Sequence, residues 1–187
     1  MPDNPYTHRG PVTGEDFFGR EKEFARLLQL LGTRPPQSVA VCGPERIGKS
    51  SLLRELCEAR GPARLPHLTF VYVDVQGAYD RAAFFRAATG KVAEDYQAFD
   101  DWLDEQPQPV VLCLDEFGKA LANEDFEDDF FDFLRSQANS GRLALVRRHV
   151  GERDRSTARA RPGWDDAELW SGPETMEVRG GRVLPDL

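Results

Sequence analysis

Apolar residues in this chain gather into short continuous runs, and stretches with helical spacing separate these runs. Continuous runs without polar alternation are typical of strands that helices cover on both faces, as in a parallel sheet. Strands that alternate with helices predict βαβ units, so we expect an α/β three-layer sandwich with a mostly parallel sheet. The predicted strands are 38–43, 68–75, 109–117 and 142–146.

The helices are predicted from apolar residues spaced three and four positions apart. Phe24, Leu27, Leu28 and Leu31 share one helical face, and Gly32 marks the end of that helix. Further helices are predicted from about residue 49 to just before residue 61, over 81–105 with a break near residue 90, and around 126–134.

The sequence "GPERIGKS" at 43–50 has the spacing of a phosphate-binding loop, with a predicted strand before it and a helix after it. Gly43 and Gly48 permit the backbone to approach a phosphate closely. Lys49 is predicted to reach the β- and γ-phosphates and to act in catalysis, Ser50 to hold Mg²⁺, and Ser51 to lie near the α-phosphate. The predicted nucleotide-binding residues of the loop are Gly43, Pro44, Glu45, Arg46, Ile47, Gly48, Lys49, Ser50 and Ser51.

Two acidic residues end the third predicted strand, at the sheet edge where open α/β folds bind ligands. Asp115 is predicted to hold Mg²⁺ together with Ser50, and Glu116 to be the general base that orients the attacking water. The same residues begin a D-x-x-G pattern found in GTPases. However, no N/T-K-x-D motif for guanine follows. ATP is therefore the favoured nucleotide.

With both motifs placed, the chain resembles the AAA+-type P-loop ATPases, most closely the STAND-like bacterial ATP-binding proteins. The resemblance rests on "NPYTHRGPV…FFGREKEFARLL" (4–28), 42–53, 70–76 and 110–146. It implies a P-loop NTPase sheet with strand order 5-1-4-3-2. It also implies that Phe18, Gly19, Arg20 and Glu21 form part of the wall around the base. Alternatively, "GRE" only begins a helix.

The C-terminal region departs from this family pattern at Arg147 and Arg148, where relatives have a small polar residue that contacts the attacking water or the γ-phosphate. Residues 147–187 hold eight arginines and only six Ile, Leu or Val, too few for another packed layer. We therefore divide the chain into an extended lead-in (1–19), a partial ATPase core (20–146) and a disordered or irregular tail (147–187).

Three explanations of the tail stay open. It is a disordered segment, or an interaction segment anchored by Trp164, Leu169 and Trp170, or the product of a frame change near residue 147, which the abrupt change within a strand favours. In each case the sheet is expected to lack its fifth strand. The edge beside the first strand would then be open to self-association or to a protein partner.

Charge and composition narrow the partners further. The net charge is −8, which argues against nucleic-acid binding. No apolar run approaches membrane-spanning length, and the N-terminus does not resemble a signal peptide. We therefore expect a cytoplasmic protein without membrane contact. Its three cysteines, without CxxC spacing, are expected to be reduced core residues.

These observations predict a Mg-ATP-binding module of an AAA+ or STAND-like ATPase, with ATP and ADP as ligands and hydrolysis weak or absent. Hydrolysis needs cations beyond the loop lysine, and Arg46, Arg147 and Arg148 are the candidates. Two alternatives remain. The chain is an active ATP-hydrolysing signalling switch, or it is a protein-interaction remnant whose acidic helix near 124–135 binds a basic partner.

Overall fold

The sheet of this protein has five strands, and every neighbouring pair is parallel. The structure is a computed structural model that describes residues 10–14, 17–150 and 174–178. The strand order is β2-β3-β4-β1-β5, which confirms the predicted α/β fold and the strand order that the resemblance implies. The strands are β1 (Val39–Gly43), β2 (Thr69–Asp74), β3 (Val110–Asp115), β4 (Leu143–Val150) and β5 (Glu174–Glu177).

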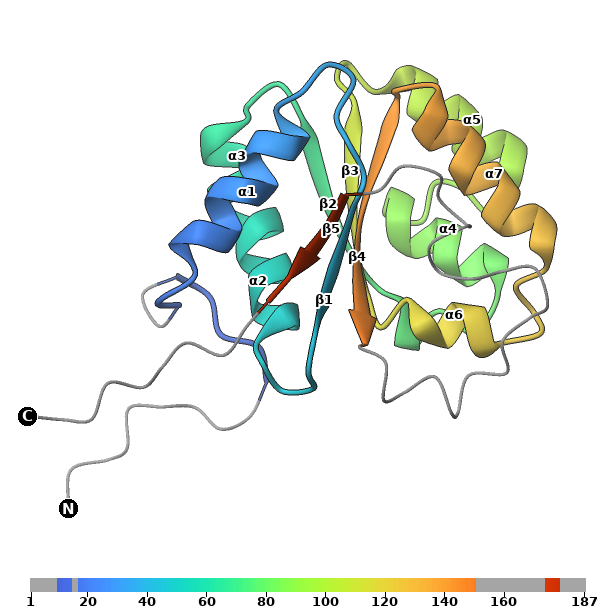
Figure 1. Cartoon of the computed structure of the whole chain (residues 1–187). Coiled ribbons are helices and arrows are strands. Elements are labelled where there is room, and N and C mark those ends of the chain that lie inside the picture. The colour runs from blue at the N-terminus through green and yellow to red at the C-terminus, as the bar shows by residue number, and fades with distance from the viewer. Residues whose placement is uncertain (1–9, 15–16, 151–173, 179–187) are drawn as a thin grey trace, which may run out of the picture.

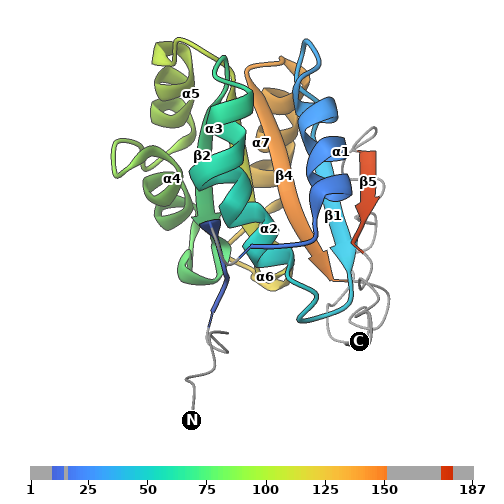
Figure 2. The same ribbon diagram turned by 90° about the vertical axis from the view of Figure 1, so that its left-hand side faces the viewer.

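Helices cover both faces of the sheet and make the predicted three layers (Figure 1). One face carries α1 (Glu21–Leu31), α2 (Lys49–Glu55) and α3 (Gly61–Arg64), as the turned view in Figure 2 also shows. The other face carries α4 (Arg81–Thr89), α5 (Tyr96–Glu105), α6 (Gly118–Ala122) and α7 (Asp128–Asn139). Short helices η2 (Leu56–Arg60) and η3 (Val75–Gly77) connect the elements.

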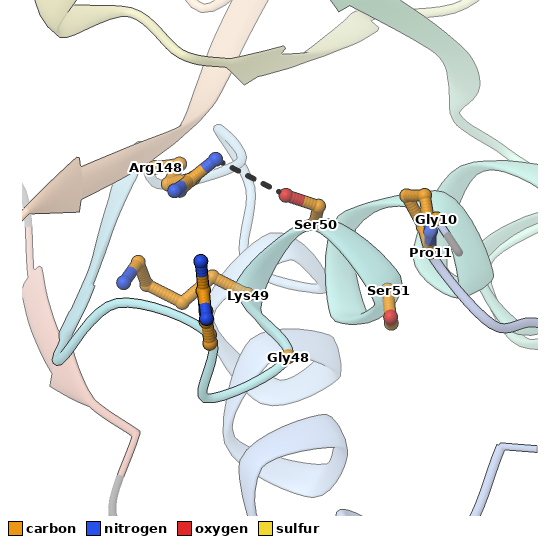
Figure 3. A pocket seen from close by; sticks show the side chains of 8 residues that line it. Gly10, Pro11, Gly48, Lys49, Ser50, Ser51 and Arg148 are labelled. Carbon is orange, nitrogen blue, oxygen red and sulfur yellow. Dashed lines mark hydrogen bonds between the residues drawn. The ribbon is translucent and has the colours of Figure 1, made fainter. Parts of the chain in front are cut away.

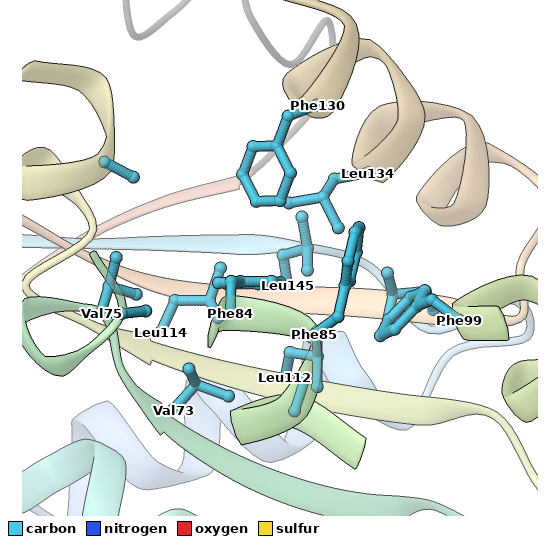
Figure 4. Close-up of a cluster of buried hydrophobic side chains, with 14 of the residues drawn as sticks. Val73, Val75, Phe84, Phe85, Phe99, Leu112, Leu114, Phe130, Leu134 and Leu145 are labelled. Carbon is cyan, nitrogen blue, oxygen red and sulfur yellow. The ribbon is translucent and has the colours of Figure 1, made fainter. Parts of the chain in front are cut away.

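A separate hydrophobic cluster lies on each face of the sheet, and β3 contributes to both. All six of its residues are buried. Val111 and Cys113 face the cluster under α1 and α2, whereas Leu112 and Leu114 face the cluster under α4 and α7. Phenylalanines fill the second cluster (Figure 4). This burial on both faces explains why the strand reads as a continuous apolar run.

The helical region 81–105 begins and breaks where short polar side chains or glycine favour it. Asp80 caps α4 by accepting a hydrogen bond from the Ala83 amide at 2.6 Å, and Asp95 caps α5 through the Ala98 amide at 2.8 Å. Gly90 ends α4 with a left-handed φ of 67°. The predicted break near residue 90 is therefore confirmed.

The helix after the phosphate loop is longer than predicted. We expected it to stop before Gly61 and Pro62, but helical turns continue through the π-helical segment η2 into α3. Pro62 lies in the first turn of α3, where the π-helical segment gives way to the α-helix. Gly61 packs against the Phe70 ring, because a Cβ there would lie 2.8 Å from it. The glycine therefore serves close helix–sheet packing instead of ending the helix.

The fourth and fifth strands correct the expectation of an incomplete sheet. β4 does not end at Val146 but continues through both arginines to Val150. β5 pairs with β1, and the ladder extends to Val178, whose amide donates to the Cys42 carbonyl at 2.7 Å. Met176 and Val178 are buried under α1 and α2. The edge of β1 is therefore covered, and the self-association expected from it loses its basis.

Parts of the predicted lead-in and tail lie outside the described residues. These parts are 1–9, 15–16, 151–173 and 179–187. The predicted anchors Trp164, Leu169 and Trp170 fall among them, as does most of the segment for which a frame change was considered.

Candidate nucleotide-binding site

The phosphate loop joins β1 to α2, and three of its residues have positive φ angles. Gly43 and Gly48 adopt φ values of 154° and 89°. Arg46 adopts 57°, a conformation that non-glycine residues rarely take. A Cβ on Gly43 would lie only 2.7 Å from the Val178 carbonyl of the neighbouring chain segment. Strained backbone of this kind clusters at ligand sites.

Lys49 is the buried cation of this loop. Its side chain lies at the start of α2, and the residue is 2% exposed. The ammonium donates to the carbonyls of Gly43 and Pro44 at 2.7 and 2.6 Å. Burial lowers the pKa of Lys49, and the nearby positive charge of Arg148 lowers it further. A bound phosphate would offset both effects, because it brings negative charge to the buried ammonium.

The N-terminal segment lies against the start of α2. The Val12 amide donates to the Ser51 hydroxyl at 3.0 Å, and the Gly14 amide donates to the Glu55 carboxylate at 2.7 Å. Ser51, predicted to contact the nucleotide, therefore also positions this segment. The contact brings residues 10–14 to the rim of the phosphate loop.

The four residues predicted to surround the base are not placed alike. Arg20 donates to the Ile47 carbonyl of the phosphate loop at 2.6 Å and pairs with Glu23 at 3.0 Å. Phe18, in contrast, is 75% exposed, and Gly19 has a φ of 78° with open space around it. Glu21 pairs with Arg60 at 2.9 Å. The contact of Arg20 with Ile47 is therefore the one that ties this segment to the loop.

The acidic strand end lies opposite the phosphate loop, as predicted. Asp115 is buried and accepts a hydrogen bond from the Tyr72 hydroxyl at 2.7 Å and one from the Glu116 amide at 3.0 Å. Burial and the hydrogen bond to Asp115 raise the pKa of Tyr72, so the phenol stays a donor at neutral pH. Glu116 has a φ of 54°, another strained residue at this site.

Arg148 joins the two halves of the site. Its Nη1 atom lies 3.2 Å from the Ser50 hydroxyl and 3.2 Å from Asp115 Oδ1, and it also bonds Glu116 Oε1. Burial alone would lower the pKa of Arg148, but the carboxylates of Asp115 and Glu116 outweigh burial and raise it. The side chain is 14% exposed. Arg147, the other candidate cation, is buried on the opposite face of the sheet.

A cavity of about 770 Å³ connects these elements. It extends from Arg148 over the start of α2 to the N-terminal segment, as Figure 3 shows. The volume falls in the range of small-molecule sites. Its lining residues are Gly10, Pro11, Arg46, Gly48, Lys49, Ser50, Ser51 and Arg148.

A sequence model of the AAA ATPase domain matches residues 16–162 of the chain. This protein belongs to that family. The match begins just before Phe17 and continues past Val146, where the sequence analysis ended the ATPase core. A search with this chain found no match among curated protein sequences.

Solved structures similar to this AAA ATPase domain include the Aeropyrum pernix ORC1 protein in complex with DNA (TM-score 0.60, 19% identity, 86% of this chain and 45% of that chain). The Walker-type ATPase of Pyrococcus abyssi has a TM-score of 0.62 and 16% identity, over 92% of this chain and 56% of that chain. The S. cerevisiae Hsp104–ADP complex has a TM-score of 0.54 and 19% identity, over 87% and 22%. At these identities the likeness concerns the fold. The chain spans about half the length of the first of these proteins.

The predicted metal ligands of the AAA ATPase domain come together, but they do not fit Mg²⁺ as arranged. Ser50 and Asp115 supply the oxygen ligands that Mg²⁺ prefers. Both of them lie 3.2 Å from the same guanidinium nitrogen of Arg148, which therefore lies where a shared ion would be.

Sequence reasoning missed three contributions to the site. Gly10 and Pro11 line the cavity. In the sequence analysis they belong to "NPYTHRGPV", which contributed only to the family resemblance. Tyr72 binds Asp115 from β2, because the register places Tyr72 beside Cys113, two residues before Asp115. Only knowledge of the strand order could have shown this contact.

Proposed function

We propose that this AAA ATPase domain binds ATP and ADP and hydrolyses ATP slowly or not at all. The observation that carries the proposal is the phosphate loop itself. Its backbone is strained at Arg46, and Lys49 is buried against the carbonyls of Gly43 and Pro44. Such a loop at a helix start, together with a buried ammonium, favours polyphosphate over other anions.

The cavity supports a definite orientation of the nucleotide. Arg46 and Lys49 line the part around the phosphate loop, so the phosphates belong there. Gly10 and Pro11 line the far end beyond Ser51, so the base and sugar belong there. Since the chain lacks the guanine motif N/T-K-x-D, we propose adenine as the base.

Slow hydrolysis is supported by the contacts of Glu116. A general base must be free to orient and deprotonate water. Here the Glu116 carboxylate bonds Arg148, which also bonds Asp115 and Ser50. The ion pair fixes the direction of the carboxylate and occupies one of its oxygens. We therefore assign Glu116 and Lys49 as the catalytic residues of a reaction that Arg148 restrains.

Further contacts support the finer assignments of the proposal. The contact of Arg20 with the Ile47 carbonyl supports the STAND-like subgroup, in which "FFGRE" belongs to the site. A cytoplasmic location agrees with the reduced state expected for the cysteines, none of which forms a disulfide. In the described part of the chain, no helix is both long and apolar enough to cross a membrane. With a net charge of −8, nucleic acid is not among the proposed partners.

Calorimetric titration of the full chain with ATP, ADP and GTP tests the proposal. We expect dissociation constants for ATP and ADP on the order of micromolar, and at least about tenfold weaker GTP binding. Lys49→Ala should weaken ATP binding by about 100-fold or more, because it removes a buried charge from the phosphates. Lys22→Ala is the matched control, because Lys22 is an exposed lysine on α1.

Two outcomes would contradict the proposal. The first is a folded wild-type chain that binds none of the nucleotides. The second is a Lys49→Ala variant that binds them as tightly as the wild type. In either case the phosphate loop would not be a nucleotide site. Phosphate release then separates slow from active hydrolysis. We expect turnover on the order of 10⁻³ s⁻¹ or slower, as in P-loop proteins without a catalytic arginine, whereas faster turnover would favour an active switch.

A further inference from the structure

The sheet places Arg148 between the two halves of the nucleotide site. β4 lies between β1 and β3. Arg148 is in register with Val41 near the end of β1, and the preceding Arg147 is in register with Leu114, the residue before Asp115. A long side chain at this position can reach both the phosphate loop and the acidic strand end. The strand order, and not a flexible loop, therefore fixes its location.

The guanidinium of Arg148 bonds all three oxygen-bearing residues that were predicted for Mg²⁺ and catalysis. A single nitrogen, Nη1, contacts the Ser50 hydroxyl and the carboxylates of Asp115 and Glu116. Tyr72 holds the second oxygen of Asp115 at 2.7 Å, so this carboxylate is fixed from both sides. The arrangement is a built site for one cation, and a protein side chain supplies that cation.

The positive charge of Arg148 is permanent. A guanidinium does not lose its proton in proteins, and the two carboxylates raise its pKa further despite burial. A metal ion depends on its concentration, whereas this charge is present in every folded molecule. Asp115 and Glu116 are thus neutralised in part before any ligand arrives, which reduces their repulsion of phosphate.

A P-loop site ordinarily uses Mg²⁺ to join its hydroxyl and acidic residue to the phosphates and to neutralise charge. Arg148 joins the hydroxyl of Ser50 to the carboxylate of Asp115 without a metal. Together with Arg46 and Lys49 it gives the cavity three cationic side chains. Metal-free ATP, which is strongly anionic, would therefore meet a positive surface, while Mg²⁺ would meet the guanidinium at its own ligands.

We propose that Arg148 replaces the Mg²⁺ ion of a P-loop site, so that this domain binds metal-free ATP and ADP. The assignment rests on the nucleotide binding proposed for the same cavity. It identifies Arg148 as the residue that determines metal dependence.

Titration of the full chain with ATP in EDTA and in millimolar Mg²⁺ tests this assignment. For the wild type, we expect ATP to bind in EDTA at least as tightly as in Mg²⁺, because Mg²⁺ withdraws metal-free ATP from the solution as its complex. Arg148→Asn should bind ATP at least about tenfold more weakly in EDTA and recover affinity in Mg²⁺, because Ser50 and Asp115 become available to the ion. Arg64→Asn, at an exposed arginine of α3, should behave as the wild type.

A wild-type affinity that falls about tenfold or more in EDTA would overturn the assignment while leaving ATP binding intact. Absence of ATP binding in both buffers would instead refute the proposed function, and this assignment with it. Arg148→Lys keeps the charge and serves as the second variant if Arg148→Asn does not fold by circular dichroism. In EDTA, Arg148→Lys should bind ATP more weakly than the wild type. Its affinity should nevertheless change less on addition of Mg²⁺ than the affinity expected for Arg148→Asn.

Discussion

The two halves of the nucleotide site, which we call its walls, are built in different ways. The phosphate loop is a contiguous segment whose shape depends on backbone angles, at Gly43, Arg46 and Gly48. The opposite wall is assembled from side chains on three strands, with Tyr72 on β2, Asp115 at the end of β3 and Arg148 on β4 as its members. The first wall is local in sequence, and the second exists only once the sheet has formed.

This difference has consequences for stability and for function. A backbone-built wall tolerates side-chain changes that leave the φ angles intact, and it fails when a glycine is replaced. A side-chain wall responds to the loss of single hydrogen bonds or charges, in proportion to their burial. Substitutions that act on one wall only can therefore show whether the two walls are independent.

The largest effect is expected from Gly43→Ala. The new Cβ would lie 2.7 Å from the Val178 carbonyl, at a φ of 154° that alanine rarely adopts. Relief requires that β1 and the segment after β5 move apart, and the phosphate loop begins at this residue. We expect a loss of about 3–4 kcal/mol in unfolding free energy and no measurable ATP binding. Chemical denaturation and calorimetry measure these two quantities.

Gly118→Ala is the control for that substitution. Gly118 begins α6, and nothing lies within 4 Å of an added Cβ. Alanine there should leave stability unchanged or raise it by about 0.4–1 kcal/mol. If Gly43→Ala behaved like Gly118→Ala, the close approach between β1 and residue 178 would not exist in solution.

Asp115→Asn acts on the side-chain wall alone. It removes the charge that faces Arg148 and weakens the acceptor of the Tyr72 hydroxyl. Because Asp115 is buried, we expect a loss of about 2–3 kcal/mol in unfolding free energy. Asp132→Asn, in an exposed i,i+3 pair with Arg135, should cost less than about 0.5 kcal/mol. Equal costs for both would mean that Arg148 does not depend on this carboxylate.

Much of the first wall was predictable because its signals are local. The motif 43–50 lies between an apolar run and a helical pattern. These two neighbours predict that the motif forms the turn between a strand and a helix. Asp115 and Glu116 were also found, since the C-terminal ends of parallel strands meet at one edge of the sheet. Which arginine turns toward them was left open between 147 and 148, because the phase of the strand had to be known.

The fifth strand shows the limit of reading apolar runs. Residues 174–178 contain just two apolar side chains, Met176 and Val178, and these alternate with polar ones. An edge strand needs only one buried side, so a weak period-two pattern is enough once β1 offers a partner. The composition of the whole segment 147–187 does not show this short pattern. For that reason the prediction that the sheet lacks a fifth strand was wrong.

A smaller effect is expected from Tyr72→Phe. The change deletes one hydroxyl, which donates to Asp115 at 2.7 Å, and keeps the ring under Arg54. We expect a loss of about 1 kcal/mol in unfolding free energy and weaker ATP binding by less than about threefold. Tyr79→Phe is the control, because Tyr79 is 67% exposed. A loss near that of Asp115→Asn would show that the tyrosine alone holds the carboxylate in place.

The smallest effect is expected from Arg20→Ala, which returns to the first wall. Arg20 donates to the Ile47 carbonyl at 2.6 Å, so it supports the loop from α1 without entering the cavity lining. If backbone angles determine the shape of the loop, losing this support should weaken ATP binding only about threefold. Arg64→Ala, at an exposed arginine, should change nothing. A loss of ATP binding as large as that from Gly43→Ala would mean that the first wall, too, depends on a side chain distant in sequence.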